Sequence, residues 1–264
     1  MRIAIFPALL SVLAVPALAQ DPAPAQPSKT QVTLLAGTDY AEGQIAGQSY
    51  DTLSTSAGMT LSKGRFSLSA SLPYLVTNAP ANLIVSQGGL FGTPLFATPI
   101  SQTTRVRRQG IGDVTVQAAY QLPTRDFDAV IAGAVKLPTA SAQDGLGSGK
   151  TDYGISGQLS KRLGAVTPFV SAGYTVIGQP QGYAVHDTLS ASAGARVILG
   201  RASGLSFDYA FAQSASDTIG DRQSVGVGLD TQLAPRLRLG LDGSTGLSAD
   251  APAMQVGLRV GLGF

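Results

Sequence analysis

Apolar and polar residues alternate along most of this sequence, from residue 31 to its end. The pattern is clearest over 254–264, MQVGLRVGLGF, where every second side chain is apolar and the positions between hold Gln255, Arg259 and three glycines. Successive side chains of a β-strand point to opposite faces. Each such segment would therefore have one apolar face and one small or polar face, and the alternation predicts a chain built of amphipathic strands.

Twelve segments with this period follow one another, separated by connections that alternate between short and long. Outer-membrane β-barrels are connected in this way, with tight periplasmic turns and longer outer loops, and an even number of strands returns both ends of the wall to the periplasm. The sequence thus predicts an all-β fold, a transmembrane antiparallel up-and-down β-barrel of twelve strands. We expect strands near 31–40, 50–63, 65–77, 105–122, 126–138, 151–163, 165–178, 185–199, 203–214, 222–233, 236–247 and 253–264, with longer loops at 41–49, 78–104, 139–150, 179–184, 215–221 and 248–252.

The aromatic residues separate a membrane barrel from the alternative, a secreted β-sandwich. A sandwich would need its large side chains inside and polar ones outside, whereas the small and charged face of these strands suits an interior. Rings on the apolar faces fall at strand ends, where amphipathic rings favour the two membrane interfaces. The expected periplasmic set is Phe66, Tyr120, Phe127 and Phe264, and the expected outer set is Tyr74, Tyr153 and Tyr174.

Both ends of the chain carry features of an exported outer-membrane protein. Residues 1–19 have a basic start, an apolar stretch and Ala17-Leu18-Ala19 at the expected cleavage point, which predicts a secretory signal peptide. Residues 20–30 are rich in Pro and Ala and are expected to form a periplasmic linker before a barrel over 31–264. The last strand resembles the terminal strand of outer-membrane barrels, so Val260, Leu262 and Phe264 are the expected signal to the barrel-assembly machinery. The predicted location is the Gram-negative outer membrane, in contact with its lipid and lipopolysaccharide.

Composition excludes several functional classes. Only 13% of the residues are charged and the formal net charge is +2, so no basic region favours nucleic acid. One histidine and no cysteine leave only scattered carboxylates for a metal. The sequence indicates no cofactor, no metal and no catalytic residue.

The polar strand faces supply the candidate lumen residues. Both signs of charge are present, and two readings stay open. The charges pair and keep a closed interior solvated, or they line a narrow passage that filters small solutes. The candidates are Arg107, Asp113, Asp128, Lys136, Asp152, Arg162, Arg196, Asp208, Asp230, Arg236, Arg238, Asp242 and Arg259.

The longest predicted loop, 78–104, is apolar although it is expected to lie outside the membrane. Loops of this length are either functional or disordered, and apolar content argues against disorder. One hypothesis is that the loop folds over or into the barrel mouth and offers an apolar lip to hydrophobic solutes. The alternative is that it packs on the barrel rim, on lipopolysaccharide or on another protomer. The lip residues would be Leu83, Leu90, Phe91, Leu95 and Phe96.

Two apparent motifs do not support an enzyme. Residues 144–151 resemble a phosphate-binding loop, but Asp144 stands at the first glycine position and no helix pattern follows. His186 is the only histidine, and Ser190 lies about 13 Å along the same strand, too far for a nucleophile and base pair. A barrel lipid hydrolase would need a serine from another strand.

Three stretches resemble a known family: GIGDV (110–114), GAVKLPTASAQDGLGSGKTDYGISGQLSKRLG (133–164) and TPFVSAGYTVIG (167–178). They are similar to outer-membrane barrels described as transporters in gene clusters for phenol and aromatic-compound degradation. That family reads approximately Lys-Leu-Pro-Thr-Gly after the strand, and 136–139 match while Ala140 departs. The resemblance implies passage of small, aromatic solutes.

The function predicted from the sequence is therefore an outer-membrane channel for passive passage of small solutes. No plug or energy-coupling segment is evident near the amino terminus. The alternatives are a structural or adhesive barrel with a closed lumen and, third, the lipid hydrolase.

Overall fold

The computed structural model describes residues 30–85, 94–96 and 104–264, and the regular structure in these ranges is entirely β. No helix in these ranges is long and apolar enough to cross a membrane. The predicted signal peptide and all but Thr30 of the predicted linker lie outside the described residues. The strands are β1 (Gln31–Ile45), β2 (Gln48–Lys63), β3 (Phe66–Pro80), β4 (Leu83–Ile84), β5 (Leu95–Phe96), β6 (Arg105–Ile111), β7 (Val114–Gln121), β8 (Asp128–Leu137), β9 (Asp152–Ser160), β10 (Val166–Val176), β11 (Thr188–Leu199), β12 (Ser203–Ala212), β13 (Arg222–Ala234), β14 (Leu237–Gly246) and β15 (Pro252–Gly263).

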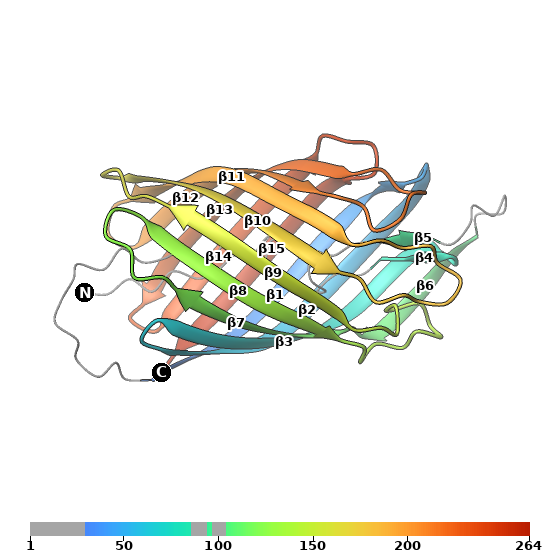
Figure 1. The fold of residues 1–264 in the computed structure, drawn as a ribbon, viewed down its shortest axis with the longest axis horizontal. Helices are drawn as coiled ribbons and strands as arrows, with labels where there is room; N and C mark the ends of the chain where they lie inside the picture. The colour runs from blue at the N-terminus through green and yellow to red at the C-terminus, as the bar shows by residue number, and fades with distance from the viewer. Residues whose placement is uncertain (1–29, 86–93, 97–103) are drawn as a thin grey trace.

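The wall strands close into a single barrel (Figure 1). Each strand pairs antiparallel with the next, and β15 pairs back on β1. β6 and β7 share one position in the wall, because both pair with β3. β4 and β5 form a separate two-stranded hairpin. The predicted closed antiparallel barrel of twelve strand positions is confirmed.

The two ends of the barrel differ in their connections (Figure 1). One end carries the start of β1, Phe264 and the compact connections 64–65, 122–127, 161–165, 200–202 and 235–236, and we call it the short-turn end. The other end, which we call the loop end, carries the connections 81–104, 138–151, 177–187, 213–221 and 247–251 together with the turn between β1 and β2.

The prediction of a long loop at 41–49 is wrong. β1 and β2 continue to a two-residue turn at Ala46 and Gly47, with φ of 49° and 76°. Two successive positive φ values suit the tight turn of a twisted hairpin. The outward positions Glu42 and Asp51 near this turn are polar. The apolar alternation therefore ends before the strands do.

The expected single strand 105–122 is interrupted at Gly112 and Asp113. Pro73 of β3 lacks an N–H and cannot donate to the ladder, and regular pairing of β3 stops at Ser71 and resumes at Tyr74. Gly112 N donates to Pro73 O at 2.8 Å. Here three residues at the junction of β6 and β7 oppose two residues of β3, which shifts the inward–outward alternation by one residue. As a result, Asp113 turns inward.

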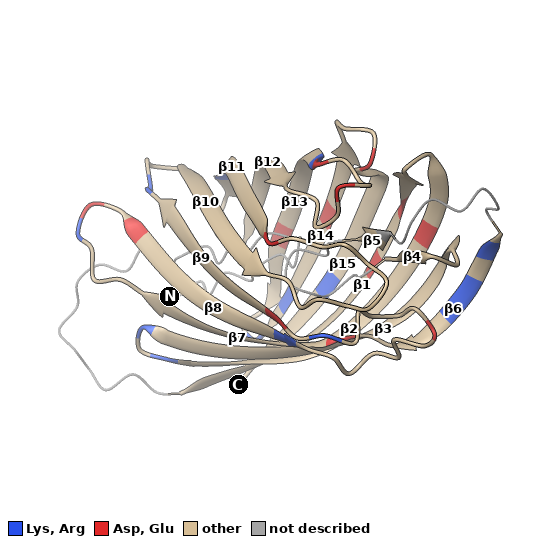
Figure 2. Cartoon of the chain, turned by 45° about the vertical axis from the view of Figure 1, so that its right-hand side comes forward, with Lys and Arg blue, Asp and Glu red and all other residues tan. Residues whose placement is uncertain are grey.

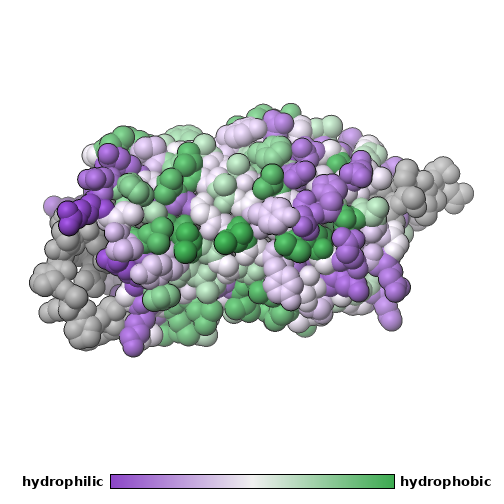
Figure 3. Space-filling model, viewed as in Figure 1, coloured by the Kyte–Doolittle hydropathy of each residue, from purple (hydrophilic) through white to green (hydrophobic). Residues whose placement is uncertain are grey.

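Most large apolar side chains of the wall strands lie on the outside of the barrel. Leu72, Val170, Phe207 and Leu258 are each 41–52% exposed on the outer face. Figure 3 shows apolar side chains across the middle of one face, with hydrophilic ones toward both ends. The rings of Phe66 and Tyr120 lie 4.5 Å apart at the short-turn end. This surface suits hydrocarbon, since an exposed apolar area of this extent would be costly in water.

Adjacent residues of β9 test which face contacts lipid. Ile155 points outward and is 64% exposed, whereas Ser156 points inward. We expect Ile155→Arg to destabilise the barrel in lipid vesicles by about 2 kcal/mol, because it places a guanidinium in hydrocarbon. Ser156→Arg, at the same depth but facing the lumen, should cost much less. Denaturant titration of folding into vesicles measures both, and equal losses would contradict the assigned faces.

Candidate functional site

The inner face of the wall is lined by small and polar side chains. Hydroxyl-bearing residues dominate β2, β3 and β10, and in these three described strands no inward side chain is charged. The inward charges in the middle of the barrel instead gather on β1 and on β11 to β15. The lumen thus has a hydroxyl-lined side and a charged side. The hydroxyl-lined side includes Thr52, Ser54, Ser56, Thr60, Ser67, Ser69, Ser71, Thr167, Ser171 and Thr175.

Ten of the thirteen candidate lumen residues lie on the inward face. Figure 2 shows how sparse the charged positions are along the wall. Several of the ten are almost completely shielded from solvent by their neighbours. The ten are Asp113, Asp128, Lys136, Asp152, Arg196, Asp208, Asp230, Arg238, Asp242 and Arg259.

Arg259 of β15 lies between carboxylates on both neighbouring strands. It donates to Asp39 Oδ1 of β1 at 2.6 Å and forms an ion pair with Asp242 of β14. All three side chains are largely buried. Two carboxylates around one guanidinium leave this cluster with one negative charge. Asp39 was absent from the predicted set, because consecutive apolar residues at Leu34 and Leu35 obscure the alternation of β1.

A second ion pair lies nearer the short-turn end. Arg196 of β11 donates two hydrogen bonds to Asp230 of β13, Nε to Oδ1 at 3.1 Å and Nη2 to Oδ2 at 2.6 Å. The guanidinium crosses over Gly204 of β12, where a Cβ would overlap it. Glycine at this position therefore allows a bidentate pair to form between strands that are not adjacent.

Lys136 lies at the loop end between two buried carboxylates. Its Nζ is 2.8 Å from Asp152 Oδ2 and 3.2 Å from Asp113 Oδ2, and it donates to Ser148 Oγ at 3.1 Å. Asp113 also accepts from Ala140 N at 3.0 Å. These contacts hold the connection 138–151 against the interruption between β6 and β7.

Three predictions of lumen position are wrong: Arg107, Arg162 and Arg236. The shift of alternation at Gly112 and Asp113 turns Arg107 outward, level with Asn78 on the outer surface. Arg162 and Arg236 lie exposed in connections at the short-turn end, where the alternation no longer applies. Arg162 Nε donates to Gly164 O at 3.3 Å.

The same shift brings Arg108 inward, which sequence reasoning missed. Arg108 is 8% exposed and donates to Leu83 O at 2.7 Å. It thereby holds the backbone at Leu83 inside the barrel mouth. Burial raises the pKa of Tyr183 in the 177–187 connection, and the positive charge of Arg108 partly offsets that shift. In the sequence, the signal for this shift is Pro73, because a proline interrupts the hydrogen-bonded ladder of a paired strand.

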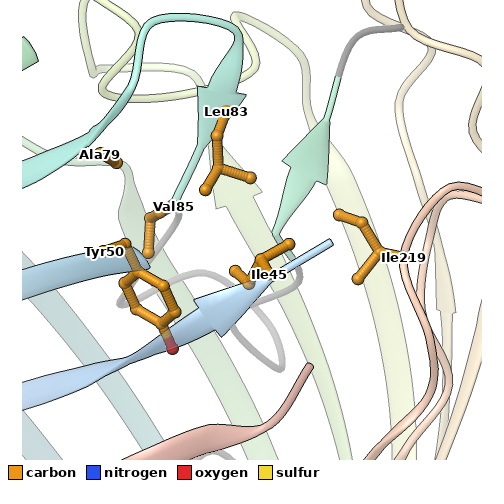
Figure 4. Close-up of a cluster of buried hydrophobic side chains, with 6 residues drawn as sticks. All are labelled: Ile45, Tyr50, Ala79, Leu83, Val85 and Ile219. Atoms are coloured by element: carbon orange, nitrogen blue, oxygen red, sulfur yellow. The ribbon is translucent and has the colours of Figure 1, made fainter. Parts of the chain in front are cut away.

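Apolar side chains from several connections meet inside the loop end. One group joins inward residues at the ends of β1 to β3 to the connections 81–104 and 213–221 (Figure 4). A second joins the 81–104 connection to 177–187 and 213–221. We call the two groups together the mouth cluster. Its buried members are Ile45, Tyr50, Ala79, Leu83, Val85, Ile219, Ile84, Leu95, Ile177 and Ala215.

Of the five predicted lip residues, the structure describes the side chains of two, Leu83 and Leu95. Leu83 and Leu95 are 0% and 4% exposed, packed inward on the mouth and not displayed to solvent. The wall offers Leu83 apolar partners at Ile45 and Tyr50, whereas Leu95 packs with residues of the connections, Ile177 and Ala215 among them. Leu90, Phe91 and the side chain of Phe96 lie outside the described residues.

His186 lies at the loop end and bridges two connections. Its Nε2 is 3.3 Å from Asp217 Oδ1, and its Nδ1 is 2.9 Å from Asp187 O. Hydrogen bonds from Tyr174 Oη and Ile177 N lower the pKa of Asp187. Ser190 points inward on β11 and is not among the contacts of His186. Among the described residues no three His, Asp or Glu side chains gather as metal ligands would.

The wall is closed, its outer surface is apolar and its lumen is polar. Together these features define an outer-membrane β-barrel. The sequence model of the family described as "Putative MetA-pathway of phenol degradation" matches residues 60–264. The chain belongs to this family.

Solved barrels share the fold at low sequence identity. An outer membrane channel from Pseudomonas putida F1 is 12% identical, with a TM-score of 0.66 over 94% of this chain and 100% of that one. The NanC porin is 9% identical, with a TM-score of 0.53 over 88% of this chain and 98% of that one. No curated protein sequence is significantly similar to this chain.

The Lys136 cluster makes a stability prediction. We expect Lys136→Met to destabilise the folded barrel by about 3 kcal/mol, because Asp113 and Asp152 would stay buried without their counter-charge. Lys150→Met, on the exposed surface of the same connection, should change stability by less than about 0.5 kcal/mol. Denaturant titration in vesicles measures both variants. A loss for Lys136→Met no larger than that of the control would contradict the buried pairing.

Proposed function

We propose that this protein is a passive channel of the outer membrane that conducts small solutes through its lumen. The observation that carries the proposal is the inner wall itself. A barrel whose interior is filled by its own side chains has large side chains inside. This inner wall instead carries hydroxyl-bearing residues, glycines and paired charges. Diffusion needs no energy-coupling element.

We infer that the short-turn end faces the periplasm and the loop end faces outward. Outer-membrane barrels place short turns in the periplasm and long connections outside. Export by a signal peptide at 1–19 and insertion by the barrel-assembly machinery complete this proposal. Val260, Leu262 and Phe264 support it, because all three point outward at the end of β15 and are 37–60% exposed. The loop end would then contact lipopolysaccharide.

Family membership supports aromatic compounds as the solutes, since the family is described by phenol degradation. An enzymatic role is not part of the proposal, because His186 contacts carboxylate and carbonyl oxygens and not a serine. The remaining alternative is a structural or adhesive barrel. The mouth cluster is the observation that favours it, since the cluster narrows the loop end.

Planar-bilayer recording tests the channel and its charged side. The refolded protein should conduct, and Arg259→Ala should raise the cation-to-anion permeability ratio roughly twofold or more, because Asp39 and Asp242 lose their counter-charge. Arg236→Ala, in a connection at the short-turn end, is the matched control and should leave the ratio unchanged.

Two outcomes of these recordings would contradict the expectation. A folded barrel that never conducts would overturn the channel and favour the structural alternative. Conduction with equal ratios for both arginine variants would place Arg259 outside the conducting path.

The mouth cluster makes a second prediction for the same recordings. Leu83→Ser combined with Leu95→Ser should weaken the packing of the mouth cluster and raise single-channel conductance. Leu247→Ser, an exposed leucine at the loop end, is the control and should leave conductance unchanged. Unchanged conductance in the double variant would show that the mouth cluster does not limit flow.

A further inference from the structure

Phe169 and Asp208 lie two strands apart on the inner wall, with Gly194 between them. Four inward positions lie side by side on adjacent strands, Phe169 of β10, Gly194 of β11, Asp208 of β12 and Gly226 of β13. The two glycines have no side chain of their own, so the side chains of Phe169 and Asp208 can extend over them.

Both side chains extend over the glycine of the next strand, and a gap is left between the ring and the carboxylate. A Cβ on Gly194 would meet Phe169 Cζ at 2.7 Å, so the ring lies over Gly194. A Cβ on Gly226 would meet Asp208 Oδ1 at 3.0 Å, so the carboxylate lies over Gly226. Gly194 and Gly226 are two strand spacings apart, about 10 Å. The ring and the carboxylate thus bound a gap of about that width.

Asp208 differs from the other inward carboxylates in the middle of the barrel. Asp39 and Asp242 are committed to Arg259, and Asp230 to Arg196. Within the described part of the chain, Asp208 has no hydrogen bond and no ion pair. Its acceptor oxygens are available to a solute.

Phe169 is equally distinctive. Of the aromatic side chains on the wall strands that the structure describes, only Phe169 and Tyr50 point inward, and Tyr50 is packed in the mouth cluster. Phe169 is partly exposed, so its ring is open to the lumen.

Neighbouring groups close the gap at both ends of the strand direction. Toward the loop end, Ser171 and Ser192 are hydrogen-bonded to each other at 2.7 Å. Toward the short-turn end lies the Arg196–Asp230 pair, whose guanidinium is already used. Neither of these neighbouring pairs forms a hydrogen bond or an ion pair with Asp208.

We propose that Phe169 and Asp208 form a binding subsite for an aromatic ring that carries a hydrogen-bond donor, and that the subsite rejects aromatic carboxylates. The inference rests on the proposed channel function and names its solute class. A solute ring about 4.5–7 Å from the Phe169 ring is at a favourable stacking distance. A hydroxyl on its far edge then lies within reach of the Asp208 carboxylate, at about 2.7 Å. A benzoate would bring a second carboxylate to that oxygen.

Current block by resorcinol and by benzoate in planar bilayers tests the subsite. Resorcinol should block the unmodified channel more strongly than benzoate does. Asp208→Asn should weaken block by resorcinol about tenfold, as expected for loss of one charge-assisted hydrogen bond, and should strengthen block by benzoate. Phe169→Leu should weaken block by resorcinol through loss of the flat ring while leaving the preference over benzoate.

Two controls match these changes. Asp128→Asn removes the same charge from the lumen near the short-turn end, and Phe207→Leu removes a ring from the lipid face of β12. Neither should alter block by resorcinol more than about twofold. If Asp208→Asn and Asp128→Asn act alike, the effect is general lumen charge and the subsite is overturned.

Saturation-transfer NMR of resorcinol with the detergent-solubilised barrel separates this inference from the channel proposal. Binding that is lost in Asp208→Asn and Phe169→Leu supports the subsite even if no current is seen, in which case only the channel proposal fails. Conduction with resorcinol binding that neither variant changes overturns the subsite and leaves the channel standing.

Discussion

Hydrogen bonding of the backbone is the constraint on which the rest of this structure depends. Hydrocarbon offers no partner for an exposed N–H or C=O, so a sheet that crosses a membrane must close on itself. Pairing of β15 with β1 achieves this closure. Opposite Pro73 the ladder with β3 cannot continue regularly. The extra residue placed there explains both the inward turn of Asp113 and the exchange of Arg107 for Arg108 at the inner face.

Closure also decides where charge is tolerated. The outer face meets lipid and is apolar, so the charged residues of the membrane-spanning region are confined to the lumen. There, most of them are paired, because partial burial makes an isolated charge costly. Arg259 joins three strands through Asp39 and Asp242, and Arg196 reaches across β12 to Asp230. These ion pairs cross-link the charged side of the lumen.

The sequence predicted the barrel well, because a two-residue period survives wherever one face meets lipid. Strand boundaries near the short-turn end and the inward position of ten of the thirteen candidate lumen charges follow from that period alone. The two-residue period gives no signal beyond the membrane, where the outward side chains do not contact lipid. β1 and β2 extend past the apolar outer surface with polar outward residues, so their pairing as far as Ala46 and Gly47 left no apolar signal. The bulge opposite Pro73 reversed the faces over β6, a one-residue effect that periodicity cannot register. Partners such as Arg259 and Asp39, 220 residues apart, are brought together only by closure.

In the proposed channel, the hydroxyl-lined and charged sides of the lumen would offer a solute different contacts. A ring with one polar edge can lie with its apolar body away from the ion pairs and its donor toward a free acceptor. Among the mid-barrel carboxylates of the described residues, Asp208 is the one that retains such an acceptor. Gly226 gives its carboxylate room to extend along the wall, and Gly194 does the same for the Phe169 ring. The strongly paired charges around it then have a second effect beyond stability. Because Arg196 is already satisfied by Asp230, it neither neutralises Asp208 nor holds an anionic solute tightly, and weak binding is what passage through a channel requires.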